Sequence, residues 1–289
     1  MKKIILSALA APLLLALGAL SVFALDDHNP IGVTGAFEGI ITTGCAYNVL
    51  NHNARREIDD ITVPGTIGKY PLKMTRYYNS RRTVGMAPGW SHGYSWSRSS
   101  DNDEVDYPDG NVWDKSCDLY GNAPLGVSDA PITLNGYPAF RLADGGTVVF
   151  GGNATNNLPI AIIDPYGQTT TLTYRNGWLD RVTEPGGRYL QFSYGIYNQV
   201  QLLSRVDAYD GQGHQIDWVA YNYTPESTGG NIITTAMCLT SVNYSDGTQA
   251  KYTYQEDNVP DDHYHGSIKA FPLVSGCDDK RYQDRKSVV

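Results

Sequence analysis

The sequence predicts an all-β fold built from antiparallel β-hairpins that share one sheet. Three observations predict it. The 289 residues include 30 Gly and 15 Pro, charged side chains make up only 18 %, and Tyr outnumbers Phe by 21 to 6. Helical bundles carry many Lys, Glu and Arg on their outer faces, whereas aromatic-rich and Gly-rich chains form short strands and turns. A hydrophobic fraction of 41 % excludes a disordered chain.

Strands are predicted wherever large and small side chains alternate. In 90–96 the rings of Trp90, His92, Tyr94 and Trp96 fall on one face. The same alternation occurs in 190–194 and 250–254, and it is typical of half-buried antiparallel strands. The best helical candidate, 53–61, is short, and no segment after residue 25 sustains a helical apolar period.

Tight turns separate these strands. Five segments pair an acid with glycine: 144–146, 164–167, 184–187, 210–213 and 246–247. In such a turn the carboxylate accepts a backbone N–H, Pro presets φ, and Gly adopts a positive φ. We therefore expect a hairpin at each of the five positions. The chain also has Asp-Asp pairs, which we attribute to turns as well.

The hairpin unit repeats in the second half of the chain. Copies of the pattern Leu-x-x-Val, acidic Gly turn, then Tyr-x-Tyr or Phe-x-Tyr begin at Leu179, Leu203 and Leu239, and an earlier copy begins at Ile162. One hairpin cannot bury its own apolar face, so the copies are expected to stack in one sheet.

The N-terminal 24 residues are predicted to be a signal peptide. Lys2 and Lys3 precede an apolar run, and Val22-Phe23-Ala24 offers a cleavage site. A transmembrane anchor is the alternative. Without the two lysines the chain has 20 basic and 30 acidic side chains, so its net charge is about −10. This charge disfavours nucleic acid. We expect a secreted or cell-surface protein that meets the membrane only through its signal peptide.

The four cysteines, Cys45, Cys117, Cys238 and Cys277, all follow the signal peptide. An even number in an oxidising compartment predicts disulfides and leaves three connectivities open. The shortest loops pair Cys45 with Cys117 and Cys238 with Cys277. Four buried thiols are the alternative. No C-x-x-C pair indicates zinc.

The repeats resemble the YD-repeat, or RHS (rearrangement hot spot), family. The segment 209–213 matches its Tyr-Asp-x-x-Gly signature, and 164–167 and 184–187 are similar to its Asp-Pro-x-Gly turns. The repeat-turn residues are Asp164, Pro165, Gly167, Glu184, Pro185, Gly187, Tyr209, Asp210, Gly213, Asp246 and Gly247. Upstream, a motif similar to the family's lead-in module comprises Arg76, Tyr78, Asn79, Ser80, Arg81, Gly89, Trp90 and His92.

The resemblance implies an extended, curved sheet, the start of a hollow RHS-like shell that encloses a C-terminal toxin or serves at the cell surface. The chain departs from the family because it has only about four repeats and no toxin domain or self-cleavage motif after them. It looks like the N-terminal part of a longer protein or a short member. The expected units are the signal peptide (1–24), an N-terminal segment (25–57), a lead-in β module (58–158), hairpin repeats (159–257) and a polar C-terminal segment (258–289).

Several clusters suggest chemistry, and each has a simpler interpretation. Residues 261–265, with His263 and His265, resemble a metal site but lack a third ligand. Residues 101–106 suggest a calcium site, but Val105 and Asp106 do not fit the EF-hand pattern. The rings around His92 suit a sugar face but are more often core. Arg76, Arg81 and Arg82 suit a carboxylate ligand, although such arginines usually pair with turn aspartates. We expect no metal, no cofactor and no catalytic residue, since Gly-x-Ser-x-Gly is absent.

The sequence thus predicts a secreted, non-catalytic structural module that starts a β-shell or surface stalk and carries or shields another polypeptide. Its expected partners are a polypeptide cargo or downstream repeats, with glycans as further candidates. The alternative is a secreted carbohydrate-binding module or carbohydrate-active enzyme that uses an aromatic platform, with Trp178 and Trp218 as the residues to test.

Overall fold

The computed structural model describes residues 47–48, 53–79, 85–99, 104–114, 128–151, 157–228, 234–256 and 270–273. Within these ranges every regular element is a β-strand, so the all-β prediction is confirmed. The described segments accordingly contain no helix of the length and apolarity needed to span a membrane.

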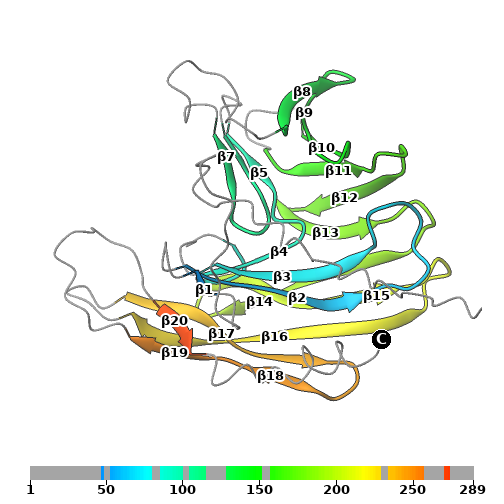
Figure 1. Ribbon diagram of the computed structural model, residues 1–289. Helices are drawn as coiled ribbons and strands as arrows, with labels where there is room; N and C mark the ends of the chain where they lie inside the picture. The colour runs from blue at the N-terminus through cyan, green and yellow to red at the C-terminus, as the bar shows by residue number, and fades with distance from the viewer. Residues whose placement is uncertain are drawn as a thin grey trace, which may run out of the picture.

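Eleven strands form one antiparallel sheet, which we call the hairpin sheet. Each strand pairs with the next one along the chain, from β8 to β18 without a crossover, and the sheet curves without closing (Figure 1). This arrangement confirms the predicted array of hairpins in an extended sheet. Its strands are β8 (Ala130–Leu134), β9 (Tyr137–Arg141), β10 (Thr147–Phe150), β11 (Pro159–Ile163), β12 (Thr169–Arg175), β13 (Trp178–Thr183), β14 (Tyr189–Tyr197), β15 (Val200–Tyr209), β16 (Gln215–Thr228), β17 (Thr234–Tyr244) and β18 (Gln249–Lys251).

The turns of this sheet fall into two classes, one on each edge. Because consecutive strands are antiparallel, the five acidic turns all lie on one edge, which we call the acid-turn edge. The turns at 135–136, 176–177 and 198–199 lie on the opposite edge, and both residues of each have positive φ. Paired positive φ values indicate type I′ turns, which match the right-handed twist of a two-residue hairpin.

A second, four-stranded sheet comes from the first part of the chain, and we call it the lead-in sheet. It consists of β1 (Tyr47–Asn48), β2 (Asn53–Thr62), β3 (Lys73–Asn79) and β4 (Trp90–His92), in that order. The best helical candidate of the sequence, 53–61, therefore lies in strand β2. Ile58 and Ile61 are buried there while Glu57 is exposed, and burial of one face selects the strand.

Two small sheets complete the fold. β5 (Ser97–Arg98), β6 (Glu104–Asp106) and β7 (Val112–Asp114) form one, and β19 (Thr253–Glu256) pairs with β20 (Ala270–Leu273) in the other. The β5–β7 sheet packs on the first strands of the hairpin sheet through a separate core that contains Trp113, Phe140 and Phe150.

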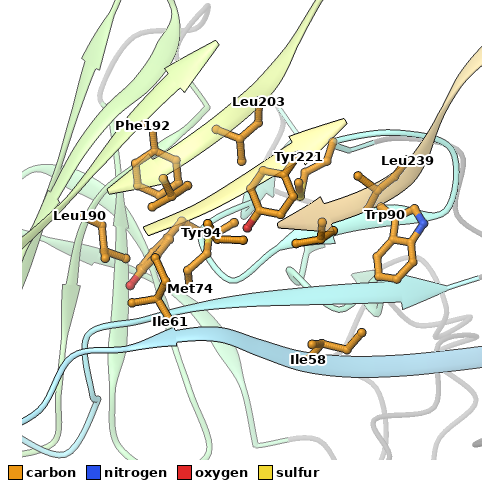
Figure 2. Packing of buried hydrophobic residues seen from close by; sticks show 14 of the residues in the cluster. Ile58, Ile61, Met74, Trp90, Tyr94, Leu190, Phe192, Leu203, Tyr221 and Leu239 are labelled. Carbon is orange, nitrogen blue, oxygen red and sulfur yellow. The ribbon is translucent and has the colours of Figure 1, made fainter. Parts of the chain in front are cut away.

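The main core lies between the lead-in sheet and one face of the hairpin sheet. Ile58, Ile61 and Met74 from β2 and β3 belong to the same buried cluster as Leu190 and Leu203 of the hairpin sheet (Figure 2). A fully buried aliphatic side chain contributes about 1.5–3 kcal/mol. This core therefore joins two segments of the chain that are far apart in the sequence.

The structure also differs in detail from the predicted elements. The alternating segment 90–96 is a strand only as far as His92, after which the chain turns. The segment 250–254 is divided between β18 and β19 at Tyr252. The hairpin sheet already begins at Ala130, within the expected lead-in module, and the expected boundary at 57/58 falls inside β2. Sheet membership thus follows strand pairing and crosses the boundaries of the sequence motifs.

Candidate functional site

An ion pair lies at the centre of the main core. Arg76 of β3, from the lead-in motif, donates from Nη2 to Oδ1 of Asp60 at 3.0 Å, and both side chains are 0 % exposed. Asp60 comes from β2, where the pairing with β3 shifts between Asp59 and Ile61. Such a bulge directs two successive side chains to one face. It therefore places Asp60 beside Ile61 in the core.

Three tyrosines of the second half of the chain surround the pair. Tyr221 of β16 and Tyr244 of β17 each donate from the hydroxyl to Asp60, both at 2.9 Å. The hydroxyl of Tyr252 accepts from two nitrogens of Arg76 at 3.2 Å. Tyr221 and Tyr252 belong to the Tyr-containing ends of repeat copies, and Tyr244 lies just before the acidic turn at 246–247. The repeats therefore supply polar groups as well as apolar ones.

The indole of Trp90 adds a further contact to the guanidinium. Its ring centroid lies 4.9 Å from Cζ of Arg76, within cation–π range, and 5.0 Å from the ring of Tyr252. Trp90 is 1 % exposed. Two residues of the lead-in motif, Arg76 and Trp90, thus meet in the core.

The electrostatics of the site fix its protonation states. Burial alone would lower the pKa of Arg76, but Asp60, Tyr252 and Tyr244 raise it well above its ordinary value. Burial and the Asp60 charge raise the pKa of Tyr221 well above 10.0. The pKa of Tyr244 is raised as well, so Tyr221 and Tyr244 stay protonated and donate to Asp60. Through these tyrosines the buried pair links the lead-in sheet to the hairpin sheet.

His92 lies beside this centre at the end of β4. Its Nδ1 accepts from the backbone N–H of Tyr94 at 3.3 Å, and its ring centroid lies 5.7 Å from that of Phe192. Burial lowers the pKa of His92 from 6.5 to about 4, so the imidazole is neutral at pH 7. Trp90 and Tyr94 are buried here, in the position that a core interpretation of this segment predicts.

Residues 64–71, within the connection between β2 and β3, form a second set of contacts, and we call this segment the strap. The strap runs along the acid-turn edge and binds three turn acids. The N–H of Ile67 donates to Oε2 of Glu184 at 3.1 Å, and the N–H of Lys69 donates to Oδ2 of Asp164 at 2.6 Å. Lys69 Nζ lies 2.8 Å from Oδ2 of Asp144, and the hydroxyl of Tyr70 donates to the same carboxylate at 2.6 Å.

In each of these turns the carboxylate has two functions. One oxygen of Asp164 accepts the N–H groups of Tyr166 and Gln168 within the turn, at 2.9 and 2.8 Å, while the other faces the strap. Burial alone would raise the pKa of Asp164, but the N–H groups of Lys69, Gln168 and Tyr166 lower it below 3.8. Contacts to the strap also lower the pKa values of Asp144 and Glu184.

The structure places the other repeat-turn residues as follows. Oδ1 of Asp210 accepts from the N–H groups of Gln212 and His214, and Oδ2 lies 3.0 Å from Nδ1 of His214. Tyr209 stacks on Tyr189 across the strands at 4.7 Å. Asp246 accepts from Thr248. Pro165 and Pro185 lie in the turns that end at Gly167 and Gly187. These two glycines have positive φ, and so do Gly213 and Gly247 in their turns.

The lead-in residues gather around the core. Tyr78 packs its ring 5.0 Å from Trp90, and the side-chain amide of Asn79 donates to the carbonyl of Asp109. Gly89 has φ +76° and lies against the Tyr78 ring, where a side chain would collide. Ser80, Arg81 and Arg82 lie outside the described residues.

Most of the remaining predicted sites lie outside the described residues. Cys238 is buried in β17, whereas Cys45, Cys117 and Cys277 lie outside the described residues, so the disulfides remain a prediction. Residues 261–265 and 101–103 also lie outside them, and Asp106 accepts from Ser97 in the β5–β6 pair. Among the residues that the structure describes, no three His, Cys, Asp or Glu side chains converge as metal ligands would.

A hollow of about 290 Å³ lies between the lead-in sheet and the edge of the hairpin sheet opposite the acid turns. Its lining is mostly apolar and includes Met86, Pro88, Val200, Leu202 and Met237. Among the described residues that line it, none is titratable.

Comparison with known proteins assigns no family to the chain. No family model and no curated protein matches it. Among solved structures, the chain is similar to TcdB2-TccC3-Cdc42 (15 % identity, TM-score 0.42) and to TcdB2-TccC3 (16 % identity, TM-score 0.43). The matches cover 70 % and 76 % of this chain but only 16 % and 17 % of those chains. The N-terminal domain of the effector protein SpvB from Salmonella typhimurium strain LT2 matches 69 % of this chain over 95 % of its own length, at 14 % identity and a TM-score of 0.35. At such low scores, membership of the YD-repeat family stays a prediction.

Sequence reasoning missed Asp60 and the strap. The Asp59-Asp60 pair is in strand β2 and not in a turn, because the bulge turns Asp60 into the core. Arg76 pairs with this strand aspartate and not with a turn aspartate. Tyr221 and Tyr252 were recognised as repeat residues, but periodicity gives only the face of a strand. It does not reveal which polar group that face meets.

Proposed function

We propose that the chain is a secreted, non-catalytic YD/RHS-repeat structural module that builds the start of a β-shell or surface stalk. Its task is to carry or shield another polypeptide, such as a toxin or effector. The observation that supports this most is the packing of the lead-in sheet on one face of the hairpin sheet, around the buried Asp60–Arg76 pair. The chain's own residues thereby cover this face of the hairpin sheet.

The two outermost strands of the hairpin sheet, β8 and β18, give the array a direction. Leu134 and Tyr137 flank a two-residue turn, which makes them a hydrogen-bonded pair. Hydrogen-bonded and non-hydrogen-bonded pairs alternate along an antiparallel ladder, so the backbone groups of Thr133 and Pro131 point away from β9. Pro131 has no N–H to donate, and proline at such a position blunts an edge against another strand. Strand β8 is therefore suited to be the first strand of the array, and within the described residues no further strand pairs with it beyond β9.

Strand β18, the outermost strand at the other side, offers backbone groups to a further strand. The N–H of Tyr252 donates to the carbonyl of Thr240, which directs the backbone groups of Gln249 and Lys251 away from β17. Beyond Tyr252, β19 pairs with β20. We accordingly propose downstream repeats as the first candidate partner of β18 and a carried polypeptide as the second candidate.

Export is part of the proposal and rests on residues 1–24. We propose cleavage after Ala24, with the mature protein secreted or at the cell surface. Determining the N-terminal residue of protein recovered outside the cytoplasm tests this. A chain beginning at Leu25 supports the proposal, and an intact N-terminus on membrane-bound protein supports the anchor.

Sequencing the gene past the codon for Val289 tests the shell or stalk function most directly. Further Tyr-Asp-x-x-Gly copies in frame, followed by a domain of another composition, would support a carrier. Absence of any further copy, together with a glycan-binding activity of the purified protein, would overturn it.

A carbohydrate-binding module is the second candidate, and one observation favours it. Trp178 is 40 % exposed at a hairpin end, with its ring 5.0 Å from that of Tyr194. In contrast, the ring of Trp218 lies 4.4 Å from the guanidinium of Arg205, which covers it. Binding on a glycan array that is lost in Trp178→Ala or Trp218→Ala would establish this function. Without such binding the structural module stands.

A further inference from the structure

We propose that the strap sets the position of the lead-in sheet on the array by recognising three consecutive acidic turns. The inference goes beyond the proposed function, because it holds whether or not the protein is exported or carries cargo. It assigns a recognition role to the turn acids Asp144, Asp164 and Glu184, which the repeat pattern alone explains as turn formers.

Each of the three contacts joins the strap to the carboxylate oxygens of a different hairpin. Following the strap from Ile67 to Tyr70, the partners run backward through the repeats, from Glu184 to Asp164 to Asp144. These acids are spaced by 20 residues in the sequence, and each opens a turn on the same edge. The strap therefore crosses the hairpins in order.

The strap segment is somewhat shorter than the spacing of the hairpins, and longer side chains at its two ends span the difference. Successive turns on one edge are two strands apart, roughly 9–10 Å. Two residues of extended chain, from Ile67 to Lys69, span at most about 7 Å. The third acid is Glu184 where the other turns carry Asp, and its extra methylene extends the reach of the carboxylate. At the other end, the long side chains of Lys69 and Tyr70 reach Asp144.

Small residues at each contact make room for the strap. A Cβ on Gly68 would lie 2.6 Å from Oδ2 of Asp164, and one on Gly146 would lie 1.9 Å from the Tyr70 hydroxyl. A Cβ on Gly186 would lie 2.6 Å from Oε1 of Glu184 and 3.1 Å from Cδ1 of Ile67. The turn glycines Gly167 and Gly247, by contrast, have no neighbour within 4 Å of such a Cβ. Gly146 and Gly186 therefore lie against the strap or its carboxylate partner, whereas Gly167, although in a turn that the strap contacts, does not.

The next turn along the edge provides an internal control. Asp210 makes the same contacts within its turn as Asp164 does, with Oδ1 accepting two backbone N–H groups. Its second oxygen contacts His214 of its own turn and not the strap. Asp164→Asn and Asp210→Asn therefore remove the same charge from the same kind of turn, and only the first removes a strap contact.

Amide hydrogen exchange of the full-length protein, resolved by NMR, tests the proposal. In the wild type the amides of Ile67 and Lys69 should be protected. Asp164→Asn should speed exchange at Lys69 by about tenfold or more, because an amide nitrogen then faces its N–H. Asp210→Asn should leave both amides unchanged.

A charge-preserving variant keeps the test decisive if Asp164→Asn fails to fold. Glu184→Asp shortens the side chain by one methylene and should speed exchange at Ile67 while Lys69 stays protected. Unchanged protection of Val219 in β16 verifies that the sheet is intact. Unprotected Ile67 and Lys69 in the wild type, or equal effects of Asp164→Asn and Asp210→Asn, would overturn the proposal.

Discussion

The guanidinium of Arg76 donates to Oδ1 of Asp60 at 3.0 Å, and neither side chain has any exposed surface. The two residues come from neighbouring strands of the lead-in sheet, yet the tyrosines that complete their hydrogen bonds come from the far end of the chain. A buried ion pair contributes little net stability by itself, but removal of one partner leaves an uncompensated charge. We therefore expect the pair to make the contact between the two sheets specific.

Asp60→Asn should destabilise the protein strongly, because it leaves the Arg76 guanidinium buried without a counter-charge. We expect a loss of about 3–5 kcal/mol in the free energy of unfolding, measured by urea titration. Asp59→Asn is the matched control, since its carboxylate is 36 % exposed beside Lys73. That variant should change stability by less than about 1 kcal/mol. Equal losses in both variants would remove the special role of Asp60.

Tyr244→Phe should cost stability through the lost hydroxyl alone. The hydroxyl donates to buried Asp60, and loss of a hydrogen bond to a charged group costs about 1.5–3 kcal/mol. Tyr137→Phe serves as the control because Tyr137 is 45 % exposed in β9. Thermal melts of the two variants provide the measurement, and an unchanged melting temperature for Tyr244→Phe would contradict the described bond.

Acid should destabilise the protein through His92. Its pKa is about 4 in the folded state and 6.5 ordinarily, so the unfolded chain binds the proton between these values. Stability is therefore fully present above pH 6.5 and falls as the pH approaches 4, by roughly 1–2 kcal/mol given the partly exposed ring. His92→Asn retains an acceptor for the Tyr94 N–H without titrating. Urea unfolding at several pH values should show a smaller slope over this range for the variant, and identical slopes would refute the assignment.

Gly146→Ala should disturb the strap, since the new Cβ would collide with the Tyr70 hydroxyl. Gly93→Ala adds the same methyl group where the nearest atom, of Thr75, is 3.8 Å away. Overpacking costs about 1–3 kcal/mol, whereas the control should be nearly neutral. Limited proteolysis within the strap and thermal melting measure both effects. A neutral Gly146→Ala would mean that Tyr70 is not held at the turn.

Much of the fold follows from local chemistry, which explains why it could be predicted. The acidic Gly turns fix where strands end, and alternating side chains fix which face is buried, so the order from β11 to β18 follows from turns and copies alone. Strands such as β8 and β9 lack the repeat pattern. Their membership of the same sheet depends on pairing, which their own residues do not reveal.

The site could be predicted only in part, because its contacts are long-range. Arg76 and Trp90 were recognisable from the lead-in motif, but their partner Asp60 depends on a bulge that reverses the local alternation. The bonds from Tyr221 and Tyr244 to Asp60 span 161 and 184 residues. Only the docking of one sheet on the other brings these groups together.

The central claim is that the lead-in sheet and the hairpin sheet form one cooperative unit joined at Asp60 and Arg76. Native-state hydrogen exchange under increasing denaturant measures this directly, through the opening free energies of β3 and β16 amides. We predict that both strands open with the same free energy and that Asp60→Asn lowers both equally. Opening of β3 at a clearly lower free energy than β16, in the wild type, would contradict the claim.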